Sequence, residues 1–395
     1  MTHPSDAAAP PFCVLAIPGD GIGREVVPAA LAVLRATGLP LELSEAEAGW
    51  DCFQQHGTAL PDATLAAARA ADAVLFGAVG SPLFPVPGYR SPIVALRKAL
   101  DLYANIRPVQ SQEPRTKNHA SPTSDSQFSV LGSQPVDLVV VRENTEGMYA
   151  GRERLEDGGD TAIAERVITR RASERIVRAA FELARARATT NHRPSTTEPS
   201  ALPGHERSSV VGRRSSNVTI VHKANVLRET CGLFRATALA VAAGYPDVAH
   251  DELLVDNCAL QLVQRPERFD VIVTTNLFGD ILSDIASYWG GGLGLATSAN
   301  LGDGRALFEP VHGSAPDIAG KGIANPLAAI GCSAELLDWL AGRAGAGAAA
   351  YTRAAEHVRA AVAQVRTSGP HTTDMGGSAR TADVTAAVLA ALAAA

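Results

Sequence analysis

Residues 12–38 read FCVLAIPGDGIGREVVPAALAVLRATG, an apolar run that passes through a glycine-rich turn into an amphipathic segment. The run FCVLAI has the composition of a buried strand, and PGDGIG is typical of a tight turn. Gly38 stands where a helix can end. Between the turn and Gly38, apolar residues recur at helical spacing, at Val27, Ala30, Leu31 and Leu34. The stretch therefore predicts a strand, a turn and a helix in succession.

The following segments repeat this alternation. LELSEAEAG at 41–49 reads as a strand, ATLAAARAA at 63–71 as a helix, and DAVLFGAVG at 72–80 as a buried strand that ends in glycine. Strands that alternate with helices form a sheet with helices on its faces. The N-terminal part is therefore expected to be an α/β domain whose sheet is covered on both sides.

The composition limits the classes of function. The chain has 395 residues, 46% hydrophobic and 19% charged, and a net charge of −6, which fits a globular protein of about two or three domains. The negative charge argues against a nucleic-acid-binding surface and against a polybasic membrane surface. No run of apolar residues is long enough to span a membrane. An acidic substrate would therefore have to be bound by local arginines.

The cysteines and the N-terminus bear on the compartment. Five scattered cysteines without a CxxC pair predict reduced core thiols, at Cys13, Cys52, Cys231, Cys258 and Cys332. The N-terminal residues MTHPSDAAAPPF contain no arginine and no apolar run, unlike a secretory or transit peptide. A cytoplasmic location is expected, and a mitochondrial matrix location is the alternative if the N-terminus is incomplete.

The rest of the chain continues the α/β pattern, with two interruptions. Helices are expected at 91–105, 172–188, 232–244, 279–291, 327–342 and in the Ala-rich tail, and strands at 136–144, 217–226 and 269–276. Residues 111–134 and 188–216 are polar and rich in serine, and are expected to be exposed, flexible insertions.

The glycines of PGDGIG invite a dinucleotide-binding interpretation. Gly19, Gly21 and Gly23 have the spacing GxGxG, whereas the Rossmann fingerprint is GxGxxG. We therefore expect the glycines to supply the positive-φ positions of a strand-to-helix turn.

Three arginines stand at or near the ends of predicted elements. Arg97 is in the helix at 91–105, Arg107 follows it in the strand-like LYANIRP, and Arg142 ends the strand VDLVVVRE. Ligands of α/β proteins bind at strand ends, and guanidinium groups bind carboxylates with two hydrogen bonds. The set suggests a site for a substrate with several carboxylates. The alternative is three separate surface salt bridges.

Asp280 and Asp284 in GDILSD are one helical turn apart, where like charges repel slightly. A hard divalent cation would remove that repulsion, and Asp256 in LVDNCALQL is a candidate third ligand. The alternative is a pair of solvated aspartates.

Lys223 in IVHKAN follows an apolar strand, where partial desolvation would lower its pKa and suit it to act as a base. Tyr149 in RENTEGMY could donate a proton. The alternatives are an ion pair of Lys223 with an aspartate and a core tyrosine with a bonded hydroxyl. Together with a metal and a carboxylate-binding group, these residues suggest the oxidative decarboxylation of a 2-hydroxy acid.

Several longer stretches resemble the β-decarboxylating dehydrogenases, which act on isocitrate, 3-isopropylmalate, tartrate or homoisocitrate. The stretches are IPGDGIGREV, LRKALDLYANIRPV, VVRENTEGMYAG, VHKANVL, NLFGDILSD and EPVHGSAPDIAGKGIANP. The resemblance implies an α/β, isopropylmalate-dehydrogenase-like, two-domain fold that is not a Rossmann fold. The large, discontinuous domain would comprise residues 1–102 and 291–395, and the small domain residues 103–290. It also implies a homodimer or a dimer of dimers with shared active sites.

The resemblance also implies roles for individual residues. Tyr149 would be the acid and Lys223 the base, the latter contributed across the dimer interface. Substrate contacts would come from Arg97, Arg107, Arg142, Tyr149, Lys223 and Asn225. Asp256 of the partner subunit, Asp280 and Asp284 would bind Mg²⁺ or Mn²⁺. Cofactor contacts would come from Val79, Gly80, Ser81, Asn225, His312, Gly313, Ser314, Ala315, Pro316, Asp317 and Asn325.

Asp317 favours NAD, because a carboxylate can bind ribose hydroxyls but repels a 2′-phosphate. NADP-using relatives have a lysine in that neighbourhood, and none stands at 317 or 318.

The substrate is expected to be the hydroxy-tricarboxylate homoisocitrate, in lysine biosynthesis through aminoadipate. GYRSPIVALR and NVLRETCGLFR look most like the fungal homoisocitrate enzymes. Val94 stands where bacterial homoisocitrate enzymes have an arginine, which leaves Ser81 and Ser91 as candidates for contact with the distal carboxylate. Isocitrate, 3-isopropylmalate and tartrate are the alternative substrates. A non-catalytic regulatory subunit and a carboxylate-binding protein without turnover are alternatives of a different class.

Overall fold

The computed structural model describes residues 10–82, 84, 86–111, 135–190 and 216–395. The chain divides into two compact units, the first comprising Met1–Pro114 and Ser283–Ala395 and the second Arg115–Leu282. The first unit is therefore discontinuous in sequence. The domain boundaries expected after residues 102 and 290 both fall inside this first unit. The expected division into a large and a small domain at these two residues stays a prediction.

The first unit contains a mixed sheet in which most neighbours are parallel. Its strand order is β2-β1-β3-β12-β11-β4. The pairs β1–β2, β1–β3 and β3–β12 are parallel, whereas β11 pairs antiparallel with β12 and with β4. The strands are β1 (Phe12–Gly19), β2 (Leu41–Glu45), β3 (Ala73–Ala78), β4 (Ala104–Gln110), β11 (Thr297–Gly302) and β12 (Arg305–Pro310).

Helices cover both faces of this sheet, as the first strand shows. Val14 and Ala16 of β1 belong to a core shared with α1, α9, α10 and α11, whereas Leu15 and Ile17 belong to a core shared with α3 and α4. Alternate residues of a strand face opposite sides, so a strand buried on both sides is continuously apolar. The helices are α1 (Gly23–Ala36), α2 (Trp50–His56), α3 (Asp62–Ala70), α4 (Pro92–Ala99), α9 (Leu327–Ala341), α10 (Ala348–Ser368) and α11 (Thr381–Ala393).

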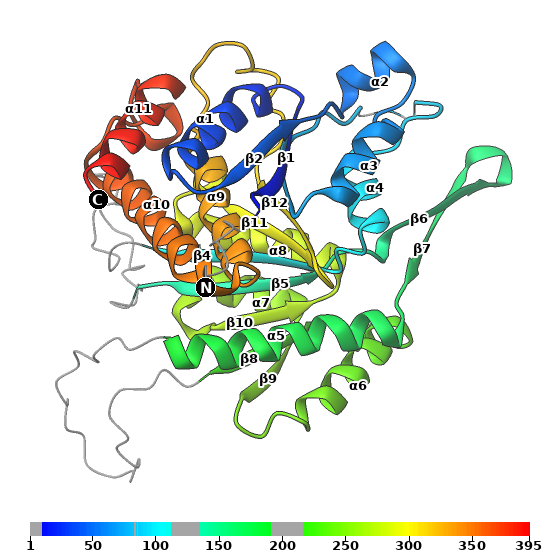
Figure 1. The fold of residues 1–395 in the computed structure, drawn as a ribbon. Coiled ribbons are helices and arrows are strands. Elements are labelled where there is room, and N and C mark those ends of the chain that lie inside the picture. The colour runs from blue at the N-terminus through cyan, green and yellow to red at the C-terminus, as the bar shows by residue number, and fades with distance from the viewer. Residues whose placement is uncertain (1–9, 83, 85, 112–134, 191–215) are drawn as a thin grey trace, which may run out of the picture. The chain divides into compact units, whose positions relative to one another are not determined.

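The second unit has four parallel strands in the order β5-β10-β8-β9. Helix α5 packs on β5, β10 and β8, and a two-stranded antiparallel ribbon, β6–β7, projects from the rest of the unit (Figure 1). The strands are β5 (Asp137–Glu143), β6 (Gly147–Glu156), β7 (Thr161–Val167), β8 (Asn217–His222), β9 (Ala249–Leu254) and β10 (Val271–Thr274). The helices are α5 (Arg170–Thr190), α6 (Thr230–Ala242), α7 (Val255–Gln264) and α8 (Asn276–Ser287), the last of which continues into the first unit.

The α/β class and most of the expected elements are confirmed, with corrections at their ends. The helix expected at 91–105 stops at Ala99, because the backbone turns at Asp101 with a φ of +48° and β4 starts at Ala104. The tail forms two helices, since α10 ends before Gly369 and Pro370. Helix α5 includes residues 188–190, which were expected to be loop.

The two expected insertions lie almost entirely outside the described residues, whereas all five cysteines lie within them. The expected insertions were residues 111–134 and 188–216. Of these, residues 112–134 and 191–215 lie outside the described residues. The five cysteines are free, and all are buried except Cys13, which is partly buried. Four of the five are therefore core thiols, as predicted, and Cys13 is not.

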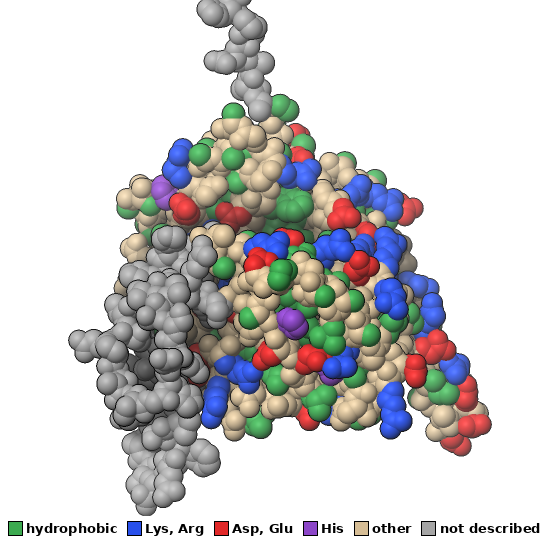
Figure 2. Space-filling model, turned by 90° about the horizontal axis from the view of Figure 1, so that it is seen from below, with side chains coloured by type: hydrophobic (Ala, Val, Ile, Leu, Met, Phe, Trp, Pro, Cys, Tyr) green, Lys and Arg blue, Asp and Glu red, His purple; other side chains and the backbone are tan. Residues whose placement is uncertain are grey.

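The charged surface is mixed. On the face drawn in Figure 2, Lys and Arg side chains are interspersed with Asp and Glu. Helix α5 contributes ion pairs such as Arg178 with Glu174 and Arg185 with Asp247. Within the described part of the chain, no helix is long and apolar enough to cross a bilayer.

The positive φ angles predicted for the glycines of the turn after β1 are confirmed at Gly19 (+73°) and Gly21 (+54°). The prediction is wrong for Gly23, which is the first residue of α1 and has no positive φ; a Cβ atom there would instead lie 2.1 Å from the carbonyl oxygen of Pro18. A Cβ atom at Gly19 would lie 2.0 Å from the carbonyl oxygen of Ala78, and one at Gly21 would lie 2.0 Å from that of Ser314. The Ile22 N–H donates to the same Ser314 oxygen at 2.9 Å. The glycines therefore serve a tight turn packed between two other segments.

We predict that Gly21→Ala destabilises the first unit by about 3 kcal/mol or more, since it adds a steric overlap to an unfavourable φ. Gly38→Ala is the matched control, because Gly38 also has a positive φ (+68°) but has open space around it. That variant should lose about 1 kcal/mol. Urea unfolding of both variants measures the difference, and equal losses would contradict the packing argument.

Candidate active site

The turn at Gly19–Gly23 anchors two loops that carry predicted cofactor residues. The Asp20 carboxylate is almost fully buried and accepts the backbone N–H groups of Trp50 (2.7 Å), Asp51 (3.1 Å) and Gly80 (2.8 Å). It thus satisfies two free N–H groups at the start of α2 and fixes the segment after β3. Because the turn also bonds the Ser314 carbonyl, the loops around Gly80 and Ser314 are held together within the first unit.

His312 has one ring nitrogen without a hydrogen-bond partner among the described residues. Its Nδ1 lies 3.0 Å from the Gly313 carbonyl oxygen, so this nitrogen carries the proton, and Nε2 is buried with no partner among the described residues. Burial lowers the pKa of His312, which favours the neutral ring. The Nε2 lone pair is then an acceptor, which suits a donor such as an adenine amino group.

The other predicted cofactor residues of the first unit are more exposed. Gly313, Pro316 and Asp317 are exposed, and Ala315 has a φ of +41°. Asn325 is buried, and its amide donates to Asp374 at 2.9 Å while its oxygen accepts the N–H of Leu327.

The predicted substrate residue Arg97, on α4, is buried in the first unit. Its Nη2 donates to Glu309 Oε1 at 2.7 Å, whereas its Nε is buried without a partner among the described residues. Ser91 occupies the N-cap position of α4, yet its hydroxyl makes no capping bond, and Ser81 is exposed. The hydroxyl of Ser91 is therefore not committed to the helix end.

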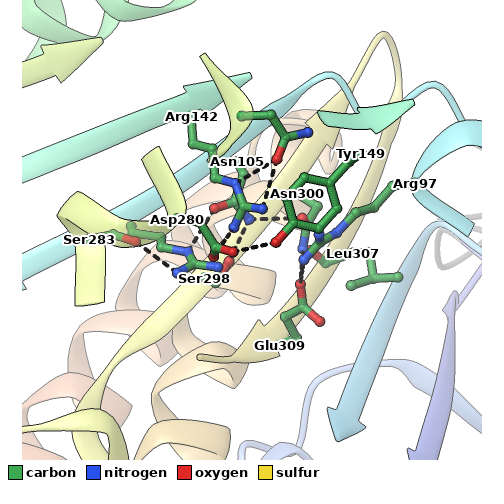
Figure 3. Close-up of polar contacts among 12 residues, drawn as sticks. Arg97, Asn105, Arg142, Tyr149, Asp280, Ser283, Ser298, Asn300, Leu307 and Glu309 are labelled. Carbon is green, nitrogen blue, oxygen red and sulfur yellow. Dashed lines mark hydrogen bonds and ion pairs between the residues drawn. The ribbon is translucent and has the colours of Figure 1, made fainter. Parts of the chain in front are cut away.

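Arg107, on β4, is held by neighbours on two elements. Its Nε donates to Asn105 Oδ1 and its Nη1 to Ser283 Oγ, both at 2.8 Å, and Nη1 also lies 3.4 Å from Asp284. Two of these neighbours, Asn105 and Ser283, are labelled in Figure 3.

In the second unit, Arg142, Tyr149 and Asp280 come together. Arg142 is 1% exposed, forms an ion pair with Asp280 and donates twice to Asn276 Oδ1, at 2.8 and 3.1 Å. The Tyr149 hydroxyl donates to Asp280 at 2.5 Å (Figure 3). Burial and the Asp280 carboxylate raise the pKa of Tyr149, so the phenol keeps its proton. A Cβ at Gly279 would lie 2.6 Å from Arg142, so α8 can approach this closely because glycine stands there.

Lys223 forms an ion pair with Asp256 in the same chain. The hydrogen bond from Lys223 holds the pKa of Asp256 below its usual value. Within a single chain, Lys223 therefore forms an ion pair with an aspartate, which was the alternative to its role as a base. Asn225, two residues further on, is exposed.

The two aspartates of α8 do not depend on a metal to offset their repulsion. Asp280 is paired with Arg142, and Asp284 lies beside Arg107, each within its own unit. Carboxylate oxygens suit Mg²⁺ or Mn²⁺, so the donor types fit such an ion. Among the described residues of one chain, no three His, Cys, Asp or Glu side chains form a metal-binding group. The three-aspartate site stays a prediction that involves a second subunit.

Sequence reasoning did not find several supporting residues. Predicted site residues are positioned by buried polar side chains from distant segments, namely Asp20, Asn105, Asn276, Asn300 and Glu309. The chemical signal was their polarity within apolar strands or beside glycine turns, which indicates burial with a partner but does not identify the partner.

His222 supports the loop that carries Lys223. Its Nδ1 accepts the N–H of Ala224 at 3.2 Å, and its Nε2 lies 3.2 Å from Glu252, which is paired with Arg235. Burial lowers the pKa of His222, which favours the neutral ring that this acceptor role requires.

Comparison with known proteins identifies the family. The sequence model described as "Isocitrate/isopropylmalate dehydrogenase" matches residues 13–196 and 208–388. The isocitrate/homoisocitrate dehydrogenase of Thermus thermophilus is 50% identical over 96% of this chain and 98% of its own length. The homoisocitrate dehydrogenase of Methanocaldococcus jannaschii is 45% identical over 94% of this chain and 95% of its own length. The crystal structure of isocitrate dehydrogenase from Methylococcus capsulatus superposes with a TM-score of 0.79 at 40% identity, over 96% of this chain and 99% of that one.

These matches extend over nearly the whole chain and agree in fold, and the family is known for the use of NAD or NADP and a divalent metal. The chain belongs to the isocitrate/isopropylmalate dehydrogenase family of oxidoreductases.

Proposed function

We propose that the chain catalyses the NAD-dependent oxidative decarboxylation of homoisocitrate to 2-oxoadipate and CO₂. The observation that carries the proposal is the carboxylate of Asp280, which binds the Tyr149 hydroxyl and the Arg142 guanidinium together. The Asp280 carboxylate, which is of a kind that binds divalent metal ions, thus contacts both a proton donor, Tyr149, and an anion-binding group, Arg142. The names of the two relatives described above support homoisocitrate as the substrate.

The arginines are suited to bind the substrate carboxylates. Arg97 has a buried Nε that finds no partner in the described part of the chain, and a substrate carboxylate would satisfy that donor. Arg107 and Arg142 are each held in one orientation by neutral oxygen acceptors as well as by an aspartate. Guanidinium groups fixed in this way bind a matching anion with little further loss of side-chain entropy.

Asp280, Asp284 and Asp256 of the partner subunit would hold Mg²⁺ or Mn²⁺. When bound, the ion would polarise the substrate oxygen, and NAD would provide the hydride acceptor. The protein's own groups would carry the protons: Lys223 of the partner subunit would accept the hydroxyl proton, and Tyr149 would donate a proton to the carbon that CO₂ leaves.

A dimer with shared active sites follows from this assignment. Leu260 and Val263 lie three residues apart on α7 and are 52% and 55% exposed, and Ile281 on α8 is 51% exposed. Exposed apolar side chains on neighbouring turns are typical of an interface. The β6–β7 ribbon also needs support, because an isolated two-stranded sheet is marginally stable in water. A second copy of the chain would cover these surfaces.

The cofactor is proposed to be NAD. Asp317 is exposed, with no ion pair in the described structure, so its carboxylate can accept hydrogen bonds from ribose hydroxyls. It would repel the phosphate of NADP.

The first test is a comparison of substrates. Purified protein with NAD and Mg²⁺ should give a larger kcat/KM on homoisocitrate than on isocitrate, 3-isopropylmalate or tartrate. Lys223→Ala and Tyr149→Phe should each lower kcat by about 100-fold or more, because each removes a proton-transfer group. A higher kcat/KM on one of the other acids would overturn the substrate assignment. No turnover of any of them would favour a regulatory subunit or a binding protein.

The second test uses mixed dimers. Lys223→Ala and Tyr149→Phe are denatured together and refolded, so that half of the dimers carry one chain of each kind. If Lys223 serves the partner's site, each mixed dimer has one intact site, and activity should return to about a quarter of the wild-type level. A site contained in one chain would give no recovery. Lys223→Ala mixed with Asp256→Asn is the control, since both residues come from the same chain and no site is restored.

The third test concerns the cofactor. Asp317→Lys should lower the ratio of kcat/KM for NAD to that for NADP by about tenfold or more, through the loss of a hydrogen bond and the attraction of a phosphate. Glu356→Lys, at an exposed position on α10, adds the same charge elsewhere and should leave the ratio unchanged. An unchanged ratio in Asp317→Lys would remove this residue from the cofactor site.

A further inference from the structure

We propose that Asn105 and Asn300 are positioning residues that couple Arg97 and Arg107 into one receptor for the substrate carboxylates. The inference rests on the proposed function, because it assumes that both arginines bind substrate. Neither asparagine is assigned a role by the resemblance or by the comparisons.

The strand pairing places these residues on one face of the first unit's sheet. Asn105 and Asn300 are directly opposite each other on β4 and β11, and Ser298 is opposite Glu309 on β11 and β12. Arg107 lies two residues beyond Asn105 and shares its face, as Ser298 does with Asn300. The two asparagines and Ser298 have no exposed surface, and Glu309 is 7% exposed.

Hydrogen bonds join the two arginines through four steps. Arg107 Nε donates to Asn105 Oδ1 (2.8 Å), and Asn105 Nδ2 donates to Asn300 Oδ1 (2.8 Å). Asn300 Nδ2 then donates to Glu309 Oε1 (2.8 Å), which also accepts Arg97 Nη2 (2.7 Å). The Arg97, Glu309, Asn300 and Asn105 side chains appear together in Figure 3.

The donors fix the direction of both amides. A guanidinium can donate but not accept, so Arg107 must face the oxygen of Asn105, and the Asn105 amide nitrogen must face Asn300. Asn300 is thereby obliged to present its nitrogen to Glu309. The second N–H of Asn105 donates to Ser298 Oγ at 2.7 Å, and that of Asn300 to the Leu307 carbonyl at 3.2 Å. An amide flip would place donors against donors, so neither arginine can turn without disturbing the other.

The test replaces one amide by a titratable group of the same shape. In Asn300→Asp, the introduced carboxyl group faces Glu309, with Arg97 and Arg107 as the charged groups at the two ends of the chain. When protonated it can donate to Glu309 as the amide does; when ionised it repels Glu309. The ratio of KM in the variant to KM in the wild type, measured with homoisocitrate, should be within about twofold at pH 6 and about tenfold or more at pH 8.5.

Two further variants separate positioning from stability. Asn105→Asp breaks the chain at its other amide. Its introduced carboxyl group would accept the Arg107 Nε and be ionised at both pH values, so its KM ratio should be about tenfold or more at pH 6 as well as at pH 8.5, and the test survives if one variant fails to fold. Ser298→Ala removes a partner of Asn105 that is not part of the path between the arginines. It should lower the thermal midpoint while its KM ratio stays near one at both pH values.

Coupling between the arginines is measured by a double-mutant cycle. Arg97 and Asn105 are separated by three hydrogen bonds in the chain. The losses in substrate affinity caused by Arg97→Lys and Asn105→Ala should therefore be smaller in combination than their sum. Additive losses, a KM ratio of Asn300→Asp that does not change with pH, or a KM ratio of Asn105→Asp near one would overturn the inference. A wild-type protein that turns over none of the hydroxy acids would instead overturn the proposed function.

Discussion

A buried guanidinium group has to be paired, and this constraint determines how the candidate site is built. Arg142 is 1% exposed, and Arg97 and Arg107 are each 7% exposed. An unpaired charge at such depth would cost several kcal/mol. The partners come from segments far away in the sequence, such as Glu309 for Arg97 and Asn276 for Arg142. The burial of Arg97 and Arg142 therefore depends on the positions of β12 and α8 within their units.

The sequence was sufficient to predict the local elements and the types of residue in the site. The strand, glycine turn and helix at 12–38 follow from hydrophobic period and turn chemistry, and the GxGxG spacing correctly excluded a Rossmann fingerprint. It was not sufficient to place the end of the helix at 91–105. Residues 100–103 have adequate helix propensity, but the packing of β4 beside β11 requires the backbone to leave the helix at Asp101. Tertiary contacts overrode propensity there.

The pairing of charges could not be predicted for a similar reason. A helical period places Asp280 and Asp284 on one side of α8, and like charges at that spacing suggested a cation. The structure gives each aspartate an arginine from its own unit, so the repulsion is already offset. For Lys223 an ion pair with an aspartate was one of the alternatives, but the sequence did not identify Asp256, 33 residues further on, as the partner. Spacing within one element shows which groups share a face, whereas their partners depend on the fold.

The use of amides between Arg97 and Arg107 has an electrostatic consequence. Two guanidiniums could be held near each other by two carboxylates, but that arrangement would cancel the positive charge and leave nothing to attract an anionic ligand. The buried chain instead contains one carboxylate, Glu309, with two neutral asparagines. Each amide supplies a directional donor and acceptor without adding charge. Arg107 also lies 3.4 Å from Asp284, but the Asp284 side chain is 56% exposed, so the buried part of the path holds two guanidiniums and a single carboxylate. The amides thus fix the orientation of two anion-binding groups without adding a second buried negative charge.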